Sequence, residues 1–223
     1  MYSRTGSALR KLALCALFAL ASCRIAGRSG PDELPTSRGL RSGDVVFMCG
    51  KSLRSIVVRL LEGTDSDYSH VGIVVIESGR AFVIHASPGH DPRTDRVVKE
   101  PWSVMVSPAR ITSARIFRSA DDSTAQRVGF VAAAAAQQFE RDALPFDHEF
   151  SLATPQTLYC TELVWRAYRA AGIDLRGRSF GSDRRYLLPS DLIKSGLLRE
   201  VALPPPVRST NRAGQTILSL PRA

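Results

Sequence analysis

The pattern of hydrophobic and polar positions along the chain predicts a small antiparallel sheet. Residues Tyr68 to Ile76 and Ala81 to Ser87 are rich in Val and Ile, and the turn Glu77-Ser78-Gly79-Arg80 separates them. β-Branched residues favour strands, and two such runs around a short Gly-containing turn are typical of a β-hairpin. Gly43 to Met48 and Ser113 to Arg118 are predicted as further strands.

The hairpin brings two histidines onto one face of the sheet. A loop of two or four residues between these strands pairs Gly72 with His85 and His70 with Ser87, so His70 and His85 become diagonal neighbours. Gly72 leaves the space between them unobstructed. A loop of three residues would instead place the two imidazoles on opposite faces.

Spacings of three and four residues predict helices elsewhere. Cys160 opens an amphipathic segment whose apolar positions precede the stop signal Gly172, and they are Leu163, Val164, Ala167, Tyr168 and Ala171. Further helices are predicted at Ser52–Leu61, at Ser123–Phe139 (which opens with a capping-box pattern and contains an alanine run) and at Pro189–Ile193. The intervals Pro88–Pro101 and Pro145–Phe150 are expected to be irregular.

The amino-terminal residues predict export. Leu12 to Ala21 form an apolar run after Arg10 and Lys11, which is the length of a signal-peptide core and too short to span a bilayer. The run ends in Leu20-Ala21-Ser22-Cys23, which resembles the lipobox of bacterial lipoproteins, in which the cysteine carries lipid. An ordinary secretory signal cut nearby is the alternative. The expected organisation is a signal peptide at 1–22, a tether at 23–40, a catalytic domain at 41–200 and a weakly ordered tail at 201–223.

Composition narrows the class of protein. Apolar residues make up 44% and charged residues 23% of the chain, which is typical of a globular domain. The formal net charge is +9, but no Lys/Arg run is interleaved with aromatic residues, so binding of nucleic acid is not expected. No CxxC spacing suggests zinc, and a zinc site from His85, His90 and Asp91 has no supporting ligand spacing.

Cys160 is the candidate for chemistry among the cysteines. The first turn of a helix directs unpaired N–H groups and the positive dipole end outward, which favours the nucleophilic thiolate. A small buried core cysteine is the alternative interpretation. Cys49 has no obvious base partner and is expected in the core, and a Cys49–Cys160 disulfide remains an alternative.

Four sequence blocks together resemble a known family. They are Asp44-Val45-Val46-Phe47, Ser69-His70-Val71-Gly72-Ile73, Ile84-His85-Ala86 and Tyr159-Cys160-Thr161-Glu162-Leu163-Val164. The set resembles the NlpC-like papain-fold superfamily, and within it the circularly permuted YiiX/YaeF branch, in which histidine precedes cysteine. The resemblance covers roughly residues 41–195. It implies an α+β, circularly permuted papain-like fold with a small antiparallel sheet packed against the Cys160 helix and the alanine-rich helix. The Asn-Cys-Glu-His-Phe pattern of the lecithin:retinol acyltransferase branch is absent.

The resemblance also implies roles for residues. Cys160 matches the nucleophile, His70 the base and His85 the polar group that orients the base, an arrangement that the chemistry of activated thiols requires. An oxyanion hole would include the backbone N–H of Cys160. Tyr68, Tyr159 and Glu162 are candidates for contact with substrate. Aromatic packing is the alternative for the tyrosines, and a dipole-complementing acid is the alternative for Glu162.

The expected function is that of a lipid-anchored cysteine amidase or peptidase of the bacterial cell envelope. It would act without a cofactor or metal through a Cys160 thioester, on murein peptide amides or on other amides. Two alternatives stay open: a lipid acyl hydrolase or acyltransferase on the same fold, and a catalytically silent envelope-binding lipoprotein. The expected partners are the envelope substrate and the membrane, reached through lipid on Cys23.

Overall fold

The computed structural model describes residues 37–52, 67–89, 91–177, 180–181 and 184–204, with two short strands beyond them. The chain divides into two units, Met1–Glu33 and Leu34–Ala223, and the first lies outside the described residues. The predicted signal segment, Cys23, His90 and all but the first residue of the helix predicted at Ser52–Leu61 also lie outside them. Within the described part, no helix is long and apolar enough to cross a membrane.

Six strands form one sheet in the order β4-β3-β2-β1-β5-β6, and each neighbouring pair is antiparallel. Their bounds are β1 Val45–Gly50, β2 His70–Glu77, β3 Arg80–Ser87, β4 Arg96–Pro101, β5 Ile111–Ser119 and β6 Leu198–Glu200. The helices are α3 Trp102–Met105, α4 Ala125–Arg141, α5 Cys160–Ala170 and α6 Pro189–Lys194. In the tail, β7 Arg208–Thr210 pairs with β8 Thr216–Leu218. The α+β class predicted from the sequence is confirmed.

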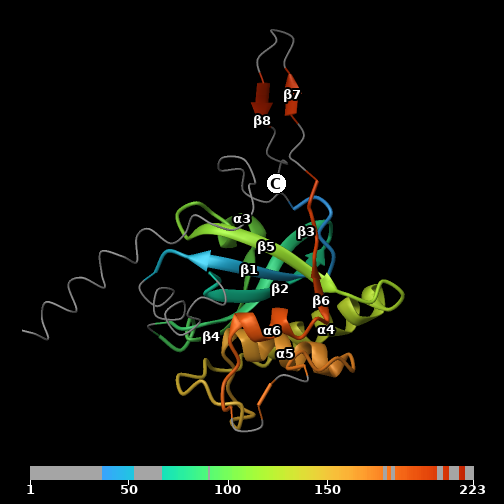
Figure 1. Ribbon diagram of the computed structural model, residues 1–223. Coiled ribbons are helices and arrows are strands. Elements are labelled where there is room, and N and C mark those ends of the chain that lie inside the picture. Colours follow the sequence, from blue (N-terminus) through green and yellow to red (C-terminus); the bar gives the residue numbers. More distant parts are fainter. Residues whose placement is uncertain are drawn as a thin grey trace, which may run out of the picture. The chain divides into compact units, whose positions relative to one another are not determined.

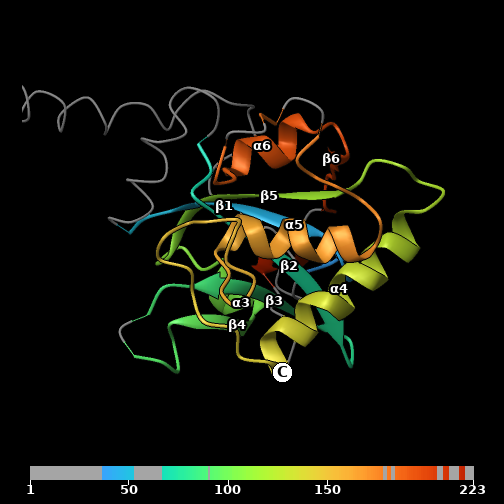
Figure 2. The same cartoon turned by 90° about the horizontal axis from the view of Figure 1, so that it is seen from below.

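The two faces of the sheet have different covers (Figure 1). Helices α4 and α5 pack on one face, and Figure 2 shows them crossing the sheet side by side. Apolar side chains of β1, β2 and β3 meet the helices there, among them Phe47, Ile73 and Ile84. On the opposite face, Trp102 and Met105 of α3 pack with Val46, Met48, Val74 and Val83. Strand residues alternate between these two cores, as the period of two requires.

The hairpin of β2 and β3 has the shorter of the two loops that keep the histidines on one face. β2 ends at Glu77 and β3 begins at Arg80, so only Ser78 and Gly79 connect them. Both residues have positive φ, 49° and 77°, as a type I′ turn requires. This turn suits the right-handed twist of the strands. The register Ile73 with Ile84 confirms the predicted alignment.

The start of β1 is fixed from two sides. Arg118 of β5 donates hydrogen bonds from Nε and Nη2 to the two carboxylate oxygens of Asp44, at 2.6 and 2.8 Å. Helix α4 approaches so closely that a Cβ added to Gly43 would lie 2.1 Å from the Cα of Gly129. Gly43 also has φ +91°, a backbone conformation that residues other than glycine rarely adopt. The Asp-Val-Val-Phe block is therefore a structural element that anchors the central strand.

The sequence-based prediction of a loop at Pro88–Pro101 is wrong in its second half. Residues Arg96 to Pro101 form β4, which pairs with β3 and lies at the edge of the sheet. Charged residues and proline are common on edge strands, because they discourage pairing with another chain, and they gave this segment the composition of a loop. The short strand β6 was also not predicted.

The predicted start of the alanine-rich helix also needs correction. Helix α4 begins at Ala125, and its N-cap Thr124 makes no capping hydrogen bond with its side chain. The carboxylate of Asp121 instead accepts hydrogen bonds from the hydroxyls of Ser123 and Thr124, so the polar cluster forms the turn before the helix. The alanine run does form a close-packed face, with Ala132, Ala133 and Ala136 buried.

Candidate active site

The hairpin joins the two histidines directly. His70 is the first residue of β2, and its Nε2 lies 2.9 Å from Nδ1 of His85 on β3, with the rings nearly perpendicular. Ser69 fixes the start of β2, because its N–H donates to the carbonyl of Met48 and its Oγ accepts from the N–H of Gly50. The predicted diagonal contact between imidazoles is thus present, and its geometry needs only residues 69–87 and β1.

A carboxylate from the edge strand extends this pair. His85 is 4% exposed, and its Nε2 has no hydrogen-bond partner within the described structure. Glu100 of β4 places Oε2 3.7 Å from that nitrogen, which is ion-pair distance but longer than a hydrogen bond. Arg110 donates from Nη1 to the same carboxylate oxygen. His70, His85, Glu100 and Arg110 therefore form a continuous polar chain.

The charges along this chain follow from burial and from neighbouring groups. Burial lowers the pKa of His70 to about 3, and repulsion from His85 acts in the same direction. His70 is therefore uncharged at neutral pH, and its environment in the absence of substrate disfavours the protonated imidazolium. The neighbouring His85, assisted by Arg110, lowers the pKa of Glu100 to about 2, so that carboxylate is ionised.

The two residues that flank Cys160 both form hydrogen bonds with the backbone of Leu187. Tyr159 precedes helix α5, and its hydroxyl accepts a hydrogen bond of 2.7 Å from the N–H of Leu187. Thr161 follows Cys160 and donates from Oγ1 to the carbonyl of Leu187, also at 2.7 Å. The Tyr-Cys-Thr block thus clamps the start of α5, and Cys160, half-buried, is its first residue.

Glu162 lies in the first turn of α5 with no exposed surface. Its Oε1 accepts a 2.5 Å hydrogen bond from Nη2 of Arg166, whereas its Oε2 is buried with no hydrogen-bond partner among the described residues. Burial raises the pKa of Glu162 to about 7, despite the opposing effect of Arg166. Arg166 also donates to the carbonyls of Thr154 and Pro155, which ties the preceding loop to the helix.

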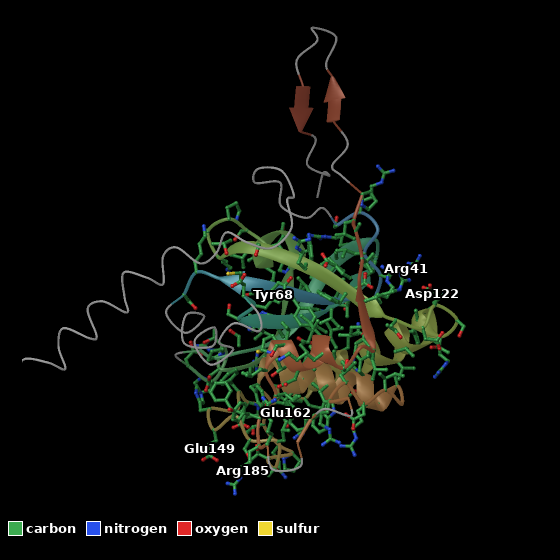
Figure 3. All side chains as sticks on the ribbon, viewed as in Figure 1. Arg41, Tyr68, Asp122, Glu149, Glu162 and Arg185 are labelled. Carbon is green, nitrogen blue, oxygen red and sulfur yellow. The ribbon has the colours of Figure 1, made fainter. Side chains whose placement is uncertain are left out.

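The three candidates for substrate contact differ in their exposure. Tyr159 is 2% exposed and Glu162 is 0% exposed. Tyr68 is partly buried with its ring edge-on to Phe47, and burial raises its pKa to about 12. Figure 3 shows Tyr68 at the sheet and Glu162 in the helical layer. Contact with substrate stays a prediction for all three residues, and Tyr68 is the most exposed of them.

The imidazole pair and the cysteine helix belong to different faces of the sheet. Val71 and Ala86, the neighbours of His70 and His85 along their strands, point into the core beneath α5, so the imidazoles point to the other face. Cys160 packs against the edge of the helix-side core, and α5 contacts β2 and β3. A contact between Cys160 and His70 therefore has to pass around the end of the sheet at which β2 begins.

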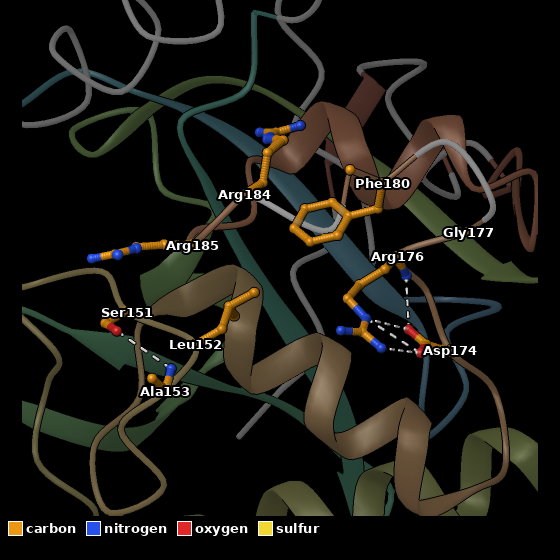
Figure 4. A pocket seen from close by; sticks show the side chains of 10 residues that line it. Ser151, Leu152, Ala153, Asp174, Arg176, Gly177, Phe180, Arg184 and Arg185 are labelled. Atoms are coloured by element: carbon orange, nitrogen blue, oxygen red, sulfur yellow. Dashed lines mark hydrogen bonds and ion pairs between the residues drawn. The ribbon is translucent and has the colours of Figure 1, made fainter.

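Cys49 and a surface cavity lie apart from these groups. Cys49 is fully buried within β1, as predicted for a core cysteine, and both described cysteines are free thiols. A cavity of about 620 Å³ lies between the segments before and after α5, lined by Leu152, Arg176, Phe180 and Arg184 among others. Figure 4 shows Arg176 turned toward Asp174, and Arg184 pairs with Asp191. The charges of these two arginines are thus balanced by carboxylates.

Sequence reasoning missed Glu100 and Arg110. The alternation of Val97 and Lys99 on one side with Val98 and Glu100 on the other was the available signal for a strand, but flanking prolines obscured it. Arg110 lies outside any element and had no signal. Among the described residues, no group of three or more His, Cys, Asp or Glu side chains is placed to hold a metal ion, and His90 lies outside that part.

A hairpin with paired imidazoles that comes before a cysteine-led helix is the layout of a papain-like fold in permuted order. A family model described as permuted papain-like amidase enzyme, YaeF/YiiX, C92 family, matches residues 39–189. The chain belongs to this family, and the resemblance stated from its four sequence blocks is confirmed.

Two relatives extend the comparison. The "Uncharacterized protein YiiX" of Escherichia coli (strain K12) is 24% identical over 183 residues, which are 82% of this chain and 83% of the relative. The crystal structure described as metalloprotein yiiX from Escherichia coli O157:H7 superposes with a TM-score of 0.56 at 21% identity, covering 74% of this chain and 98% of that one. At this identity the second match supports the fold alone.

Proposed function

We propose that the protein is a cysteine amidase or peptidase in which Cys160 is the nucleophile, His70 the base and His85 the group that orients the base. The observation that carries the proposal is the 2.9 Å contact between Nε2 of His70 and Nδ1 of His85. A papain-type thiol requires an imidazole whose second nitrogen is held by a polar partner, and this contact supplies that partner. Membership of the permuted papain-like amidase family supports the same assignment.

The chemistry follows from the free nitrogen of the base. Because Nε2 of His70 is engaged by His85, Nδ1 is the atom that takes the proton from the Cys160 thiol. The thiolate attacks the carbonyl carbon of an amide, and the oxyanion is stabilised by backbone N–H groups at the start of α5. The imidazolium returns its proton to the leaving amine as the C–N bond breaks. Water, deprotonated by His70, then hydrolyses the thioester and frees the thiol.

In the proposed mechanism Cys160 approaches His70 around the end of the sheet, and His70 is suited to this because it is the first residue of its strand. His70 is the first residue of β2 and Cys160 is the first residue of α5, so each group stands at an end of its element. The clamp of Tyr159 and Thr161 on Leu187 fixes the helix start from which the thiol must reach. Preorganisation of this kind is what catalysis by a thiolate–imidazolium pair requires.

We extend the proposal to the cell envelope. The apolar run and Leu20-Ala21-Ser22-Cys23 favour export and lipidation, and the substrate class we propose first is the amide bonds of murein peptides. Amides or esters of lipids are the second class. The yiiX crystal structure is described as that of a metalloprotein.

The experiment that tests the function pairs the two cysteines. Cys160→Ser is expected to abolish turnover of murein fragments, N-acyl substrates or phospholipids, whereas Cys49→Ser is expected to change it little because Cys49 is buried in β1. Iodoacetamide is expected to label Cys160 faster than Cys49 near neutral pH. If Cys49→Ser abolishes activity instead, the assignment of Cys160 as the nucleophile is wrong. Equal, slow labelling of both thiols with no turnover would favour the silent binding lipoprotein.

The anchoring proposal has its own test. Cys23→Ala is expected to release the protein from the membrane fraction or to block its processing. The measurement is membrane fractionation together with the intact mass of the mature chain. An unmodified first residue in the mature protein would exclude lipidation and leave an ordinary secretory signal.

A further inference from the structure

Glu100 stands behind the two imidazoles in a position that the matched sequence blocks do not include. It comes from the edge strand β4, where Val83 pairs with Glu100 and His85 with Val98. Glu100 is therefore a diagonal neighbour of His85 on the same face of the sheet. Its carboxylate is the one acid that a described salt bridge joins to either imidazole of the pair.

The protonation pattern of the site depends on what Nε2 of His85 faces. If His70 is to accept a proton on Nδ1, its own proton must lie on Nε2, and that N–H then donates to Nδ1 of His85. His85 must in turn carry its proton on Nε2, the nitrogen that is buried without a hydrogen-bond partner in the described structure. The atom facing it at 3.7 Å is Oε2 of Glu100.

Arg110 helps to keep the Glu100 carboxylate ionised, which is the form that accepts hydrogen bonds. It donates to Oε2 of Glu100, and together with His85 it holds the pKa of Glu100 at about 2. Lys99, the neighbour of Glu100 on β4, points to the other face and pairs with Glu77 at 3.0 Å. The groups that the described residues direct at the Glu100 carboxylate are therefore the imidazole of His85 and the guanidinium of Arg110.

We propose that Glu100 is a positioning residue that selects the Nε2–H tautomer of His85, and through it the Nδ1 base form of His70. When His70 takes the proton of Cys160, the negative carboxylate stabilises the imidazolium, and the gap between Glu100 and His85 shortens to a hydrogen bond. No proton leaves His85. The proposal rests on the proposed function for its catalytic meaning, but the tautomer itself exists without a substrate.

The test uses the full chain with Glu100→Gln and the matched control Glu77→Gln. The control removes an ion pair of similar exposure on the opposite face, between Glu77 and Lys99. Imidazole ¹⁵N shifts are expected to show His85 protonated on Nε2 in the unmodified chain. In Glu100→Gln, the rate of Cys160 alkylation at neutral pH is expected to fall about tenfold and its pH midpoint to rise. This is the size expected when a charge within about 4–6 Å is removed.

The outcomes separate this proposal from the proposed function. A proton on Nδ1 of His85 in the unmodified chain, or equal effects of the Glu100 and Glu77 substitutions, would overturn the role of Glu100. If no substrate is turned over while Glu100→Gln still disturbs the His85 tautomer and the control does not, the positioning role stands and the enzymatic function falls. Unchanged circular dichroism and thermal midpoint identify variants that retain the fold.

Discussion

Two glutamates, one in each half of the proposed site, have pKa values shifted in opposite directions. Glu100, on the sheet, is ionised at neutral pH because it faces His85 and is bound by Arg110. Glu162, on α5, shares one oxygen with Arg166 and leaves the other buried without a hydrogen bond, so its pKa rises to about 7. Both have an arginine partner. The difference lies in exposure, 26% for the Glu100 side chain and 0% for Glu162, and in the imidazole of His85, which faces only Glu100.

This comparison divides the proposed site into two halves. The sheet half, with His70, His85 and Glu100, contains the charged and titratable groups, and the α5 half holds the backbone around Cys160 in place. On the sheet, His70, His85 and Glu100 follow one another, so in the proposed mechanism the carboxylate of Glu100 would compensate a proton accepted by His70. On α5, the polar groups bind backbone carbonyls and hold the helix start in place. Substitutions in the first half should therefore change rates and pH profiles, and substitutions in the second half should change stability.

The largest expected effect is on the sheet. His70→Ala should lower kcat/KM by about 10²–10⁴-fold, the usual contribution of general base catalysis. His85→Asn or His85→Gln should retain measurable activity, because a short polar group can still hold the ring of His70, and His85→Ala should lose more. A pH–rate series on all four variants measures this. Equal losses for His70→Ala and His85→Asn would show that the two imidazoles do not divide the work as proposed.

A smaller effect is expected on α5, in stability. The folded protein binds a proton at Glu162 up to about pH 7, whereas the unfolded chain releases it near 4.5, so this group's contribution to stability is lost as pH rises between those values. Glu162→Gln should therefore unfold at higher denaturant concentration than the unmodified chain above pH 7. One pKa unit corresponds to about 1.4 kcal/mol, which bounds the gain at about 3 kcal/mol, less whatever the Arg166 pair contributes.

Denaturant unfolding of both proteins at pH 5 and pH 8 checks this prediction, with Glu149→Gln on the exposed loop as the control. A variant that is less stable than the unmodified chain at pH 8 would mean that the ion pair with Arg166 outweighs the cost of burying the carboxylate. The stability of the α5 half would then depend on an ion pair, as the electrostatics of the sheet half do.

Local sequence predicted the hairpin and the cysteine helix correctly, because each depends on few residues. The positions of Ser78 and Gly79 determine the register of β2 and β3, and Gly172, with φ +85°, ends the helical segment as predicted. The diagonal relation of His70 and His85 followed from that register alone. The family resemblance then assigned the order of the elements, which the family match confirms.

Features that depend on partners distant in sequence could not be predicted. The closeness of Tyr159 to Cys160 predicts contact with substrate, whereas in the structure both Tyr159 and Thr161 form hydrogen bonds with the backbone of Leu187, which has no sequence signal for that role. The helix position of Glu162 predicts an acid that complements the helix dipole, but burial by packed neighbours dominates its pKa. Glu100 was hidden because an edge strand with charged residues has the composition of a loop.

The two-residue turn at Ser78 and Gly79 also has a consequence for the order in which the molecule assembles. Strands joined by so short a connection lose little chain entropy on pairing, whereas pairing of β1 with β5 must bring Val45 to Phe117 across the residues that form β2, β3, β4 and α3. Low contact order favours early formation. The hairpin that carries His70 and His85 is thus expected to form early, whereas Cys160 lies on a helix much later in the chain. If the proposed function is right, the thiol and its base are brought together only after most of the sheet has formed.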